Sequence, residues 1–440
     1  MDTFEGLANA GFAEINTAYY EPDQTPVQKF PVKQRNVFRQ PFNNLTLGAA
    51  GNQMVIPATM APLVKRVSIT LQLPANSGSG TSSSYYGLSV GQGWGYQLIR
   101  NIRWKIGGSK EEQKAGINHC ISLMAKCETQ DKQLELMNLG GYSLLTTNSS
   151  NDFSTYPDKL TAYCHLDLPF SDVRALFTRR PLDSRLTTGQ NIVIWLDLSP
   201  ANAVISQSTV NSVAPAALPT QLSAGEWLVE LLEMPDAFSI EKQLLTVPDA
   251  WYAYPALWEM SGAQTLINQP YTYPNRFTTM LSGFQAGQLL GIQVFAVRNG
   301  DLSPGGVVNP YNLVELTDLT LSYTGTDLAI FPGKSYQLAH AVHTMRPSYI
   351  PQQVLSVTPS TGYSAAIAKS YFVMFDLSQY SVFAPTDLRL QYGENVGTGQ
   401  INLTLSTPVG DSASTSYTLF VTYFYTESIE FARGVVKYVM

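Results

Sequence analysis

Charged side chains are scarce in this sequence. Asp, Glu, Lys and Arg together make up 14% of its 440 residues, against roughly 25% in an average soluble protein. Ser, Thr, Asn, Gln and Tyr take their place, and 32 Gly and 26 Pro residues supply turns. This composition favours β-sheets joined by many loops. It suits a subunit whose surface is largely covered by neighbouring copies better than a freely diffusing enzyme.

A basic excess is also absent, because 27 Lys and Arg residues stand against 33 Asp and Glu residues, a net charge of −6. The charge of the whole protein therefore gives no reason to expect tight or sequence-specific nucleic-acid binding. No stretch approaches 18 uninterrupted apolar residues, so we expect no membrane-spanning helix. The N-terminal segment is acidic and has no basic segment followed by an apolar run, so we expect no signal peptide.

Cysteine and histidine are rare, with three Cys and four His residues. Cys120 and Cys127 lie in a predicted helix, where their separation of about 10 Å exceeds the roughly 7 Å Cα limit of a disulfide. No Cys-x-x-Cys motif occurs, and His119 beside Cys120 is too little for a zinc site. We therefore expect reduced, buried thiols at these positions and at Cys164, in a protein made in the cytosol, with no metal and no cofactor.

The N-terminal segment divides by charge into an acidic block followed by a basic block. Residues 4–20 have the apolar spacing of a short amphipathic helix. We interpret residues 1–45 as an N-terminal arm that docks on something else, the alternative being a frayed terminus. The basic residues of this arm, its candidate contacts to a membrane or a neighbour, are Lys29, Lys33, Arg35 and Arg39.

Strands dominate the rest of the chain. Residues 63–74 and 98–108 alternate apolar and polar side chains, the period of a half-buried strand. Residues 110–141 have a helical spacing of apolar residues and end in a Gly-Gly stop. Two low-complexity stretches, 77–84 and 201–222, are predicted to be long exposed loops.

The most informative feature is a weak internal repeat, in which four short segments recur in the same order about 190–220 residues later. Two copies of one β-sandwich domain explain this order most simply, because the offset is far too long for a solenoid. The pairs are NIRWKIGG (101–108) with DLTLSYTG (318–325), YCHLDL (163–168) with YFVMFDL (371–377), GQNIVIWLDLSP (189–200) with GQINLTLSTP (399–408), and EWLVELLEMP (226–235) with YTLFVTYFY (417–425).

Each half offers several short strands with long connections, the pattern of a β-sandwich or jelly roll. The predicted fold is therefore all-β, with two tandem jelly rolls and a few short helices in the loops. We place the first jelly roll at 46–245 and the second at 246–440. An aromatic segment of Trp251, Tyr252, Tyr254 and Trp258 is the expected seam between them.

Catalytic motifs fail on their context. Gly-Leu-Ser-Val-Gly around Ser89 matches a nucleophile elbow, but a Ser/Gly loop precedes it. Gly333-Lys334-Ser335 resembles the end of a phosphate-binding loop, but Leu328 replaces the first glycine of that motif. His340 and His343 have metal-compatible spacing only on a helix and no nearby acid. We therefore predict no catalytic, cofactor or metal residues, and no enzyme activity.

The chain resembles the double jelly-roll major capsid proteins of tailless icosahedral DNA viruses. The resemblance rests on residues 98–138, where a strand and a Gly-Gly turn precede an amphipathic helix. It also rests on residues 163–198, where LDLPF and an Arg/Pro-containing loop lead into NIVIWLDL, and on the duplication.

This resemblance implies a structural role in the virion, after synthesis in the host cytoplasm. Such proteins form trimers whose six jelly rolls make a pseudo-hexagonal tile, and they assemble with further copies and with penton or minor capsid proteins. The N-terminal segment usually lies at the inner side of the shell, where the basic residues of the arm could meet the phosphates of an internal membrane. The loops at 77–84 and 201–222 would form an exposed crown.

Two other classes stay open. A carbohydrate-active or carbohydrate-binding β-sandwich would bring acids together from distant strands into one cleft and would be a monomer. A receptor-binding spike or minor capsid protein would share the fold elements but form isolated trimers. The duplication argues against the spike, since a tiling protein gains a near-six-fold outline from two copies of its domain.

Overall fold

The computed structural model describes the greater part of the chain. The described residues are 34–57, 63–74, 88–90, 93–108, 111–116, 119–120, 123, 130–142, 144–145, 160–168, 182–183, 191–207, 217–233, 252–267, 276–281, 287–299, 313–314, 316–331, 349–358, 362–371, 373–376, 394–396, 400–406, 416–432 and 435–439. The predicted helix at 4–20, Lys29, Lys33, the loop at 77–84, Cys127, Trp251, the 333–335 motif, His340 and His343 lie outside them.

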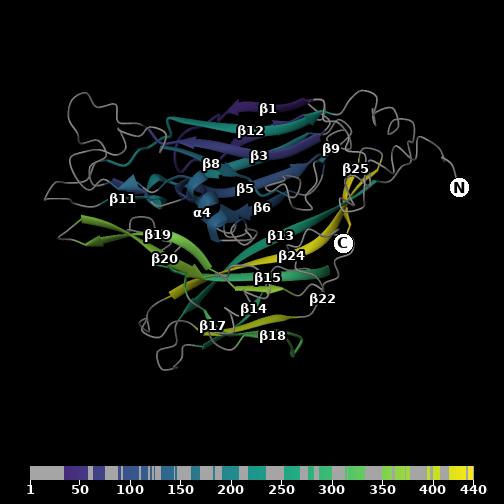
Figure 1. Cartoon of the computed structure of the whole chain (residues 1–440). Helices are drawn as coiled ribbons and strands as arrows, with labels where there is room; N and C mark the ends of the chain where they lie inside the picture. The colour runs from purple at the N-terminus through teal and green to yellow at the C-terminus, as the bar shows by residue number, and fades with distance from the viewer. Residues whose placement is uncertain are drawn as a thin grey trace.

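The first half of the chain, from β1 to β12, contributes three antiparallel sheets (Figure 1). The largest has the order β1 (Gln34–Pro41), β12 (Ala224–Glu233), β3 (Leu63–Gln72) and β8 (Thr161–His165), with β9 (Leu182–Asp183) also paired to β3. The second has the order β2 (Asn52–Ile56), β10 (Ile192–Leu198), β5 (Ile99–Ile106) and β6 (Glu112–Ala115). A small third sheet joins β11 (Ile205–Gln207), β4 (Leu88–Val90) and β7 (Leu144–Leu145). The helical elements are α2 (Trp94–Leu98), α4 (Gln130–Leu139) and the short 3₁₀ turn η4 (Ala201–Ala203).

The second half, from β13 to β25, builds its own sheets. The largest has the order β13 (Tyr252–Ile267), β24 (Ser416–Ala432), β15 (Gly287–Arg298) and β16 (Leu313–Val314), with β21 (Val373–Asp376) and β22 (Glu394–Val396) also on β15 and β25 (Val435–Val439) on β24. Facing it is a sheet of order β14 (Arg276–Leu281), β23 (Ile401–Ser406), β17 (Thr317–Tyr323) and β18 (Thr326–Phe331). A hairpin of β19 (Tyr349–Thr358) and β20 (Gly362–Tyr371) stands apart.

Alternation of apolar and polar side chains closes each sandwich. Along β3, Val67, Ile69 and Leu71 are fully buried. Along β10, Ile192 and Ile194 point the same way as their register partners on β2 and β5, and all of them are buried. Because successive side chains of a strand alternate between the two faces of the sheet, each sheet turns one apolar face to the other and the core forms between them.

The two halves share one topology. The order β2-β10-β5-β6 of the first half matches β14-β23-β17-β18 of the second, and β1-β12-β3 matches β13-β24-β15. The four repeated sequence segments fall on equivalent strands of the two halves: β5 with β17, β8 with β21, β10 with β23 and β12 with β24. The predicted duplication, and with it the predicted pair of jelly-roll sandwiches, is therefore confirmed.

Several local predictions were wrong. Residues 201–222, expected as one long exposed loop, include η4 and β11, and Ala201, Val204, Ile205 and Leu222 are buried. Residues 112–115, expected at the start of the long helix, form β6 and pair with Asn101–Trp104 of β5, an arrangement in which the buried Lys114 reaches the Asp167 carboxylate. The helical residues begin at Gly116 and α4 ends before Gly140-Gly141, as predicted. The predicted arm also extends too far, since its residues 34–41 form β1 at the edge of the largest sheet of the first half, where Phe38 packs against the core.

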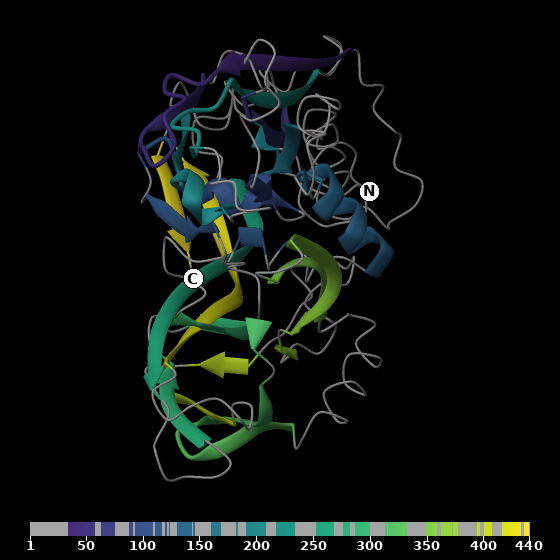
Figure 2. The same ribbon diagram turned by 90° about the vertical axis from the view of Figure 1, so that its left-hand side faces the viewer.

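The halves lie side by side, with the first above the second in Figure 1. Strand β6 of the first half lies against β13 of the second, and α4 lies against β19. Figure 2, turned by 90°, shows α4 (blue) and the β19–β20 hairpin (light green) on the same side of the molecule. This arrangement joins two sandwiches along one seam.

Candidate functional site

The seam between the halves is lined by aromatic side chains of β15 and β24. Phe295 and Phe420 are register partners, and their rings stack with centroids 5.0 Å apart and an angle of 10° between planes. Together with Val297 and Phe424 they belong to the same hydrophobic cluster as the core of the first half. The seam is thus an extension of that core.

The opposite face of the same two strands fills the core of the second half. Ile292, Val294 and Ala296 alternate with the seam residues along β15, and they pack in the second cluster with Leu419 and Val421 of β24. The described parts of β15 and β24 are therefore buried on both faces, which explains why these strands are rich in apolar residues. The expected seam residues Tyr252, Tyr254 and Trp258 lie on β13, whose backbone runs beside β24.

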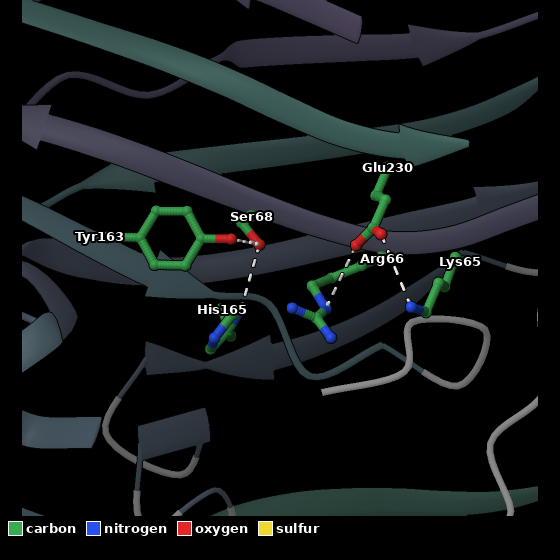
Figure 3. A network of polar contacts seen from close by, with 6 residues as sticks. All are labelled: Lys65, Arg66, Ser68, Tyr163, His165 and Glu230. Atoms are coloured by element: carbon green, nitrogen blue, oxygen red, sulfur yellow. Dashed lines mark hydrogen bonds and ion pairs between the residues drawn. The ribbon is translucent and has the colours of Figure 1, made fainter. Parts of the chain in front are cut away.

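The corresponding sheet of the first half has a polar outer face, drawn in Figure 3. We call its six residues the sheet-face network: Lys65, Arg66, Ser68, Tyr163, His165 and Glu230. The strand register brings them together, because Ser68 lies opposite His165 and Glu230 lies opposite Arg66. Cross-strand neighbours on one face of a sheet contact each other directly.

The carboxylate of Glu230 is held by two cations. Lys65 Nζ lies 3.5 Å from one oxygen and Arg66 Nε lies 3.8 Å from the other. The three side chains are largely shielded from solvent, so their mutual attraction is screened less than that of an exposed pair. The Glu230 carboxylate is thus an ion-pair partner of both Lys65 and Arg66.

A chain of hydrogen bonds runs across the other side of the network. The Tyr163 hydroxyl donates to Ser68 Oγ at 2.9 Å, and Ser68 Oγ lies 3.2 Å from His165 Nδ1. The Tyr163 and His165 rings meet edge-on, with centroids 4.8 Å apart and an angle of 88°. Burial and, to a smaller extent, the Arg66 guanidinium lower the pKa of His165 from 6.5 to about 4. The imidazole is therefore neutral near pH 7.

This Ser–His pair does not have the arrangement of a hydrolase. A nucleophilic serine needs access to substrate and a base oriented by a third group. Ser68 is 1% exposed, and among the contacts between described residues no carboxylate reaches the His165 ring. The geometry instead links neighbouring strands of one sheet face.

A second polar contact lies inside the first half. Lys114 Nζ on β6 and Asp167 Oδ2, just after β8, are 3.3 Å apart and both side chains are buried. The backbone N–H of Asp167 donates to His119 Nε2 at 2.8 Å. The pair ties β6 and the following helical residues to the end of β8. Sequence reasoning missed it because the two charges are distant in the chain.

Solved structures match this architecture, although no protein-family model matches the chain and no curated protein matches it. The structure of VP54 of PBCV-1, fitted into a reconstruction of the virophage Sputnik, has a TM-score of 0.58 and 11% identity, over 95% of this chain and 99% of that one. The structure of the Sputnik virophage has a TM-score of 0.55 and 11% identity, over 95% and 91%. The PBCV-1 virus capsid has a TM-score of 0.53 and 10% identity, over 95% and 99%. The chain has the double jelly-roll fold.

Of the four basic residues predicted to make contacts, two lie on a strand of the first jelly roll. Arg35 and Arg39 are residues of β1, opposite Leu232 and Leu228 of β12. The side chain of Arg39 is exposed, as is that of Val37 between them in sequence, which is 53% exposed. The structure thus places two of the four basic residues on an edge strand of the first jelly roll, while Lys29 and Lys33 lie outside the described residues.

The rejected chemical motifs can now be located in part. Ser89 is the central residue of β4, paired on both sides, with β11 and β7. The short helix α2 begins four residues after β4, but Ser89 lies within the strand and not on the turn where a nucleophile elbow requires it. Cys120 and Cys164 are buried, and neither forms a disulfide. Burial and the neighbouring Cys120 raise the pKa of the Cys164 thiol.

Within the described ranges, no group of three or more His, Cys, Asp and Glu side chains is placed to hold a metal ion. No helix in the described part of the chain has the length and apolar character needed to cross a membrane.

Proposed function

We propose that this chain is the major capsid protein of a tailless icosahedral virus, a structural subunit without a catalytic role. The observation that carries this proposal is the duplicated sandwich: two halves of one topology, matched over 95% of the chain by solved viral capsid structures. The proposed jelly rolls span 46–245 and 246–440, with β1 added to the first. The site of such a protein is its set of contacts to other copies.

The proposed assembly is a trimer whose six jelly rolls give a pseudo-hexagonal tile, repeated in a closed shell. Support comes from the duplication, because two similar units per chain and three chains per tile place six similar units around one axis. In a symmetric shell each contact between copies is repeated many times, so even a subunit with few charged residues is held firmly in the assembly. Penton or minor capsid proteins are the proposed partners at the remaining positions.

The proposed role of the N-terminal segment is contact with a neighbour or with the phosphates of an inner viral membrane, through Lys29, Lys33, Arg35 and Arg39. Support comes from the basic character of this stretch and from the exposure of Arg39 on β1. Polybasic segments gain attraction from anionic lipid surfaces. The proposed location is the virion, after synthesis in the host cytoplasm, around a genome that the chain does not read by sequence.

Light scattering of the purified chain, followed by negative-stain imaging, tests this function. The expected result is a mass of three chains, particles of hexagonal outline, and larger shells at high protein concentration. A chain that stays monomeric at every concentration, in buffers of low and physiological salt, would contradict the proposal. Such a monomer would instead direct attention to the carbohydrate-active alternative.

A further inference from the structure

The duplication makes each strand of the first jelly roll the counterpart of one in the second. Strand β1 occupies the same place in its sheet as β13 does, beside β12 and β24 respectively. Strand β6 at the end of the order β2-β10-β5-β6 corresponds to β18 at the end of β14-β23-β17-β18. A contact that one jelly roll makes can therefore be compared with the same place on the other.

Inside one chain, β13 and β6 are in contact. Strand β6 of the first jelly roll lies against β13 of the second, and next to this contact Phe295 and Phe420 are buried in the first jelly roll's core cluster. The outer face of the β13-β24-β15 sheet is thus covered by the first jelly roll of the same chain.

The counterpart surface on the first jelly roll is open along β1. Phe38 points to the core, and the residues of the other face, Val37, Arg39 and Pro41, are exposed. Val37 is 53% exposed, the highest value among the exposed large apolar side chains of the described residues. Strand β18, the counterpart of β6, has only β17 as a partner among the described strands. Figure 1 shows β1 and β18 at opposite ends of the molecule.

We infer that the outward side of β1 is the surface on which the second jelly roll of another copy docks, through its β18 edge. The inference rests on the proposed function and deepens it, since it names the contact between copies. The occupant is a second copy of this chain. Strand β18 is the counterpart of β6 and β1 is the counterpart of β13, so a contact between β18 and β1 of two copies would repeat the contact that β6 and β13 make within one chain. The contact is heterologous, so repeating it gives a ring when the rotation closes and a filament when it does not. Three copies close the ring of six jelly rolls.

The contact within the chain and the proposed contact between copies differ in their side chains. The covered face within the chain centres on the stacked rings of Phe295 and Phe420, with Gln293 and Thr422 buried beside them. The β1 side and the sheet beside it are mixed, with Val37 near the paired Glu230 and with the exposed Arg39. An interface that forms between separately folded copies is commonly polar around a small apolar centre. The sequence of β18 includes one acidic residue, Asp327.

Matched substitutions of two exposed apolar residues on edge strands test the inference. Val37→Asp is expected to raise the dissociation constant of the trimer by about tenfold or more, since an unpaired carboxylate would be buried. Met280→Asp is the control, because Met280 is 50% exposed on β14, at the edge of its sheet away from β18. It is expected to leave the trimer unchanged. Circular dichroism melting curves should be the same for both variants and the wild type, which separates assembly from folding.

A crosslink identifies the occupant directly. One preparation carries Val37→Cys and a second carries Asp327→Cys, and the two are mixed with a short bis-maleimide linker. The expected product is a covalent dimer that forms only in the mixture. Trimers that form normally with Val37→Asp and give no such dimer would overturn the inference and leave the proposed function standing. A wild-type chain that never leaves the monomer would overturn the proposed function itself.

Discussion

Phe295 and Phe420 stack face to face across two strands of the second jelly roll, yet they are buried in the core of the first. One sheet therefore serves two cores, with alternate side chains of β15 and β24 assigned to each. The two hydrophobic cores are therefore separated only by the backbone of this shared sheet. The two sandwiches should lose their structure together.

Phe295→Ala tests this coupling. The substitution removes a fully buried aromatic ring and is expected to lower the free energy of unfolding by about 3–5 kcal/mol. Urea unfolding gives the size of the loss. Hydrogen exchange should report faster opening in β10 of the first jelly roll as well as in β23 of the second. Met280→Ala, at an exposed position, is expected to change neither; loss of protection confined to the second jelly roll would contradict a shared core.

Much of this fold could be predicted because apolar and polar residues alternate regularly along many of the strands. Val67, Ile69 and Leu71 of β3 were expected on one face and are buried there, and the repeated segments fall on equivalent strands. The predictions failed where tertiary pairing overrides local pattern. Residues 112–115 have helix-forming side chains, but pairing with β5 and the buried Lys114–Asp167 contact hold them as a strand.

The candidate sites were harder to predict, because they depend on strand register. Ser68 was expected on the solvent side of its strand and is instead buried against His165, which lies 97 residues further along the chain. Nothing in either local sequence specifies which residue of β8 faces Ser68, since that choice is made when the sheet assembles. The pairing of Phe295 with Phe420 could not be predicted either, because the sequences of their strands show only that both are apolar.

His165 makes the stability of the first jelly roll depend on pH. Its folded pKa of about 4 lies below the ordinary 6.5, so the unfolded chain binds more protons between these values. The free energy of unfolding should therefore fall as the pH drops from about 6.5 to about 4, by roughly 3 kcal/mol from this residue. Arg66 adds like charge near the ring, although its guanidinium is also paired with Glu230.

Urea unfolding at a series of pH values, for the wild type and His165→Gln, isolates this contribution. The difference in stability between the two proteins should shrink toward acid and stay constant above about pH 6.5, where both states are neutral at this position. The imidazole pKa itself can be followed by NMR. A folded pKa near 6.5 would show that the ring is not protected from protonation.

Removing only one residue of the buried Lys114–Asp167 ion pair should destabilise the protein more than removing both. Lys114→Met leaves a buried carboxylate without its cation, and the expected loss is about 3–5 kcal/mol. The double variant Lys114→Met with Asp167→Leu removes both charges and should lose much less, because desolvation of the ions is removed with their attraction. Chemical denaturation of Lys114→Met, of Asp167→Leu and of the double variant measures the coupling; equal losses for the single and double variants would contradict it.

Gln293 is a buried polar residue of the seam, opposite Thr422 of β24. It lies two residues before Phe295 on β15, is fully buried, and neither atom of its amide has a hydrogen-bond partner. A buried amide without partners costs about 1–3 kcal/mol, so Gln293→Met should raise the free energy of unfolding by about that amount. Gln40→Met is the matched control, because Gln40 Nε2 donates to the carbonyl of Gln53 at 3.4 Å and its loss should give no gain. A Gln293→Met protein less stable than the wild type in urea would mean that the amide is satisfied in solution, and that the seam is wetter than its phenylalanines suggest.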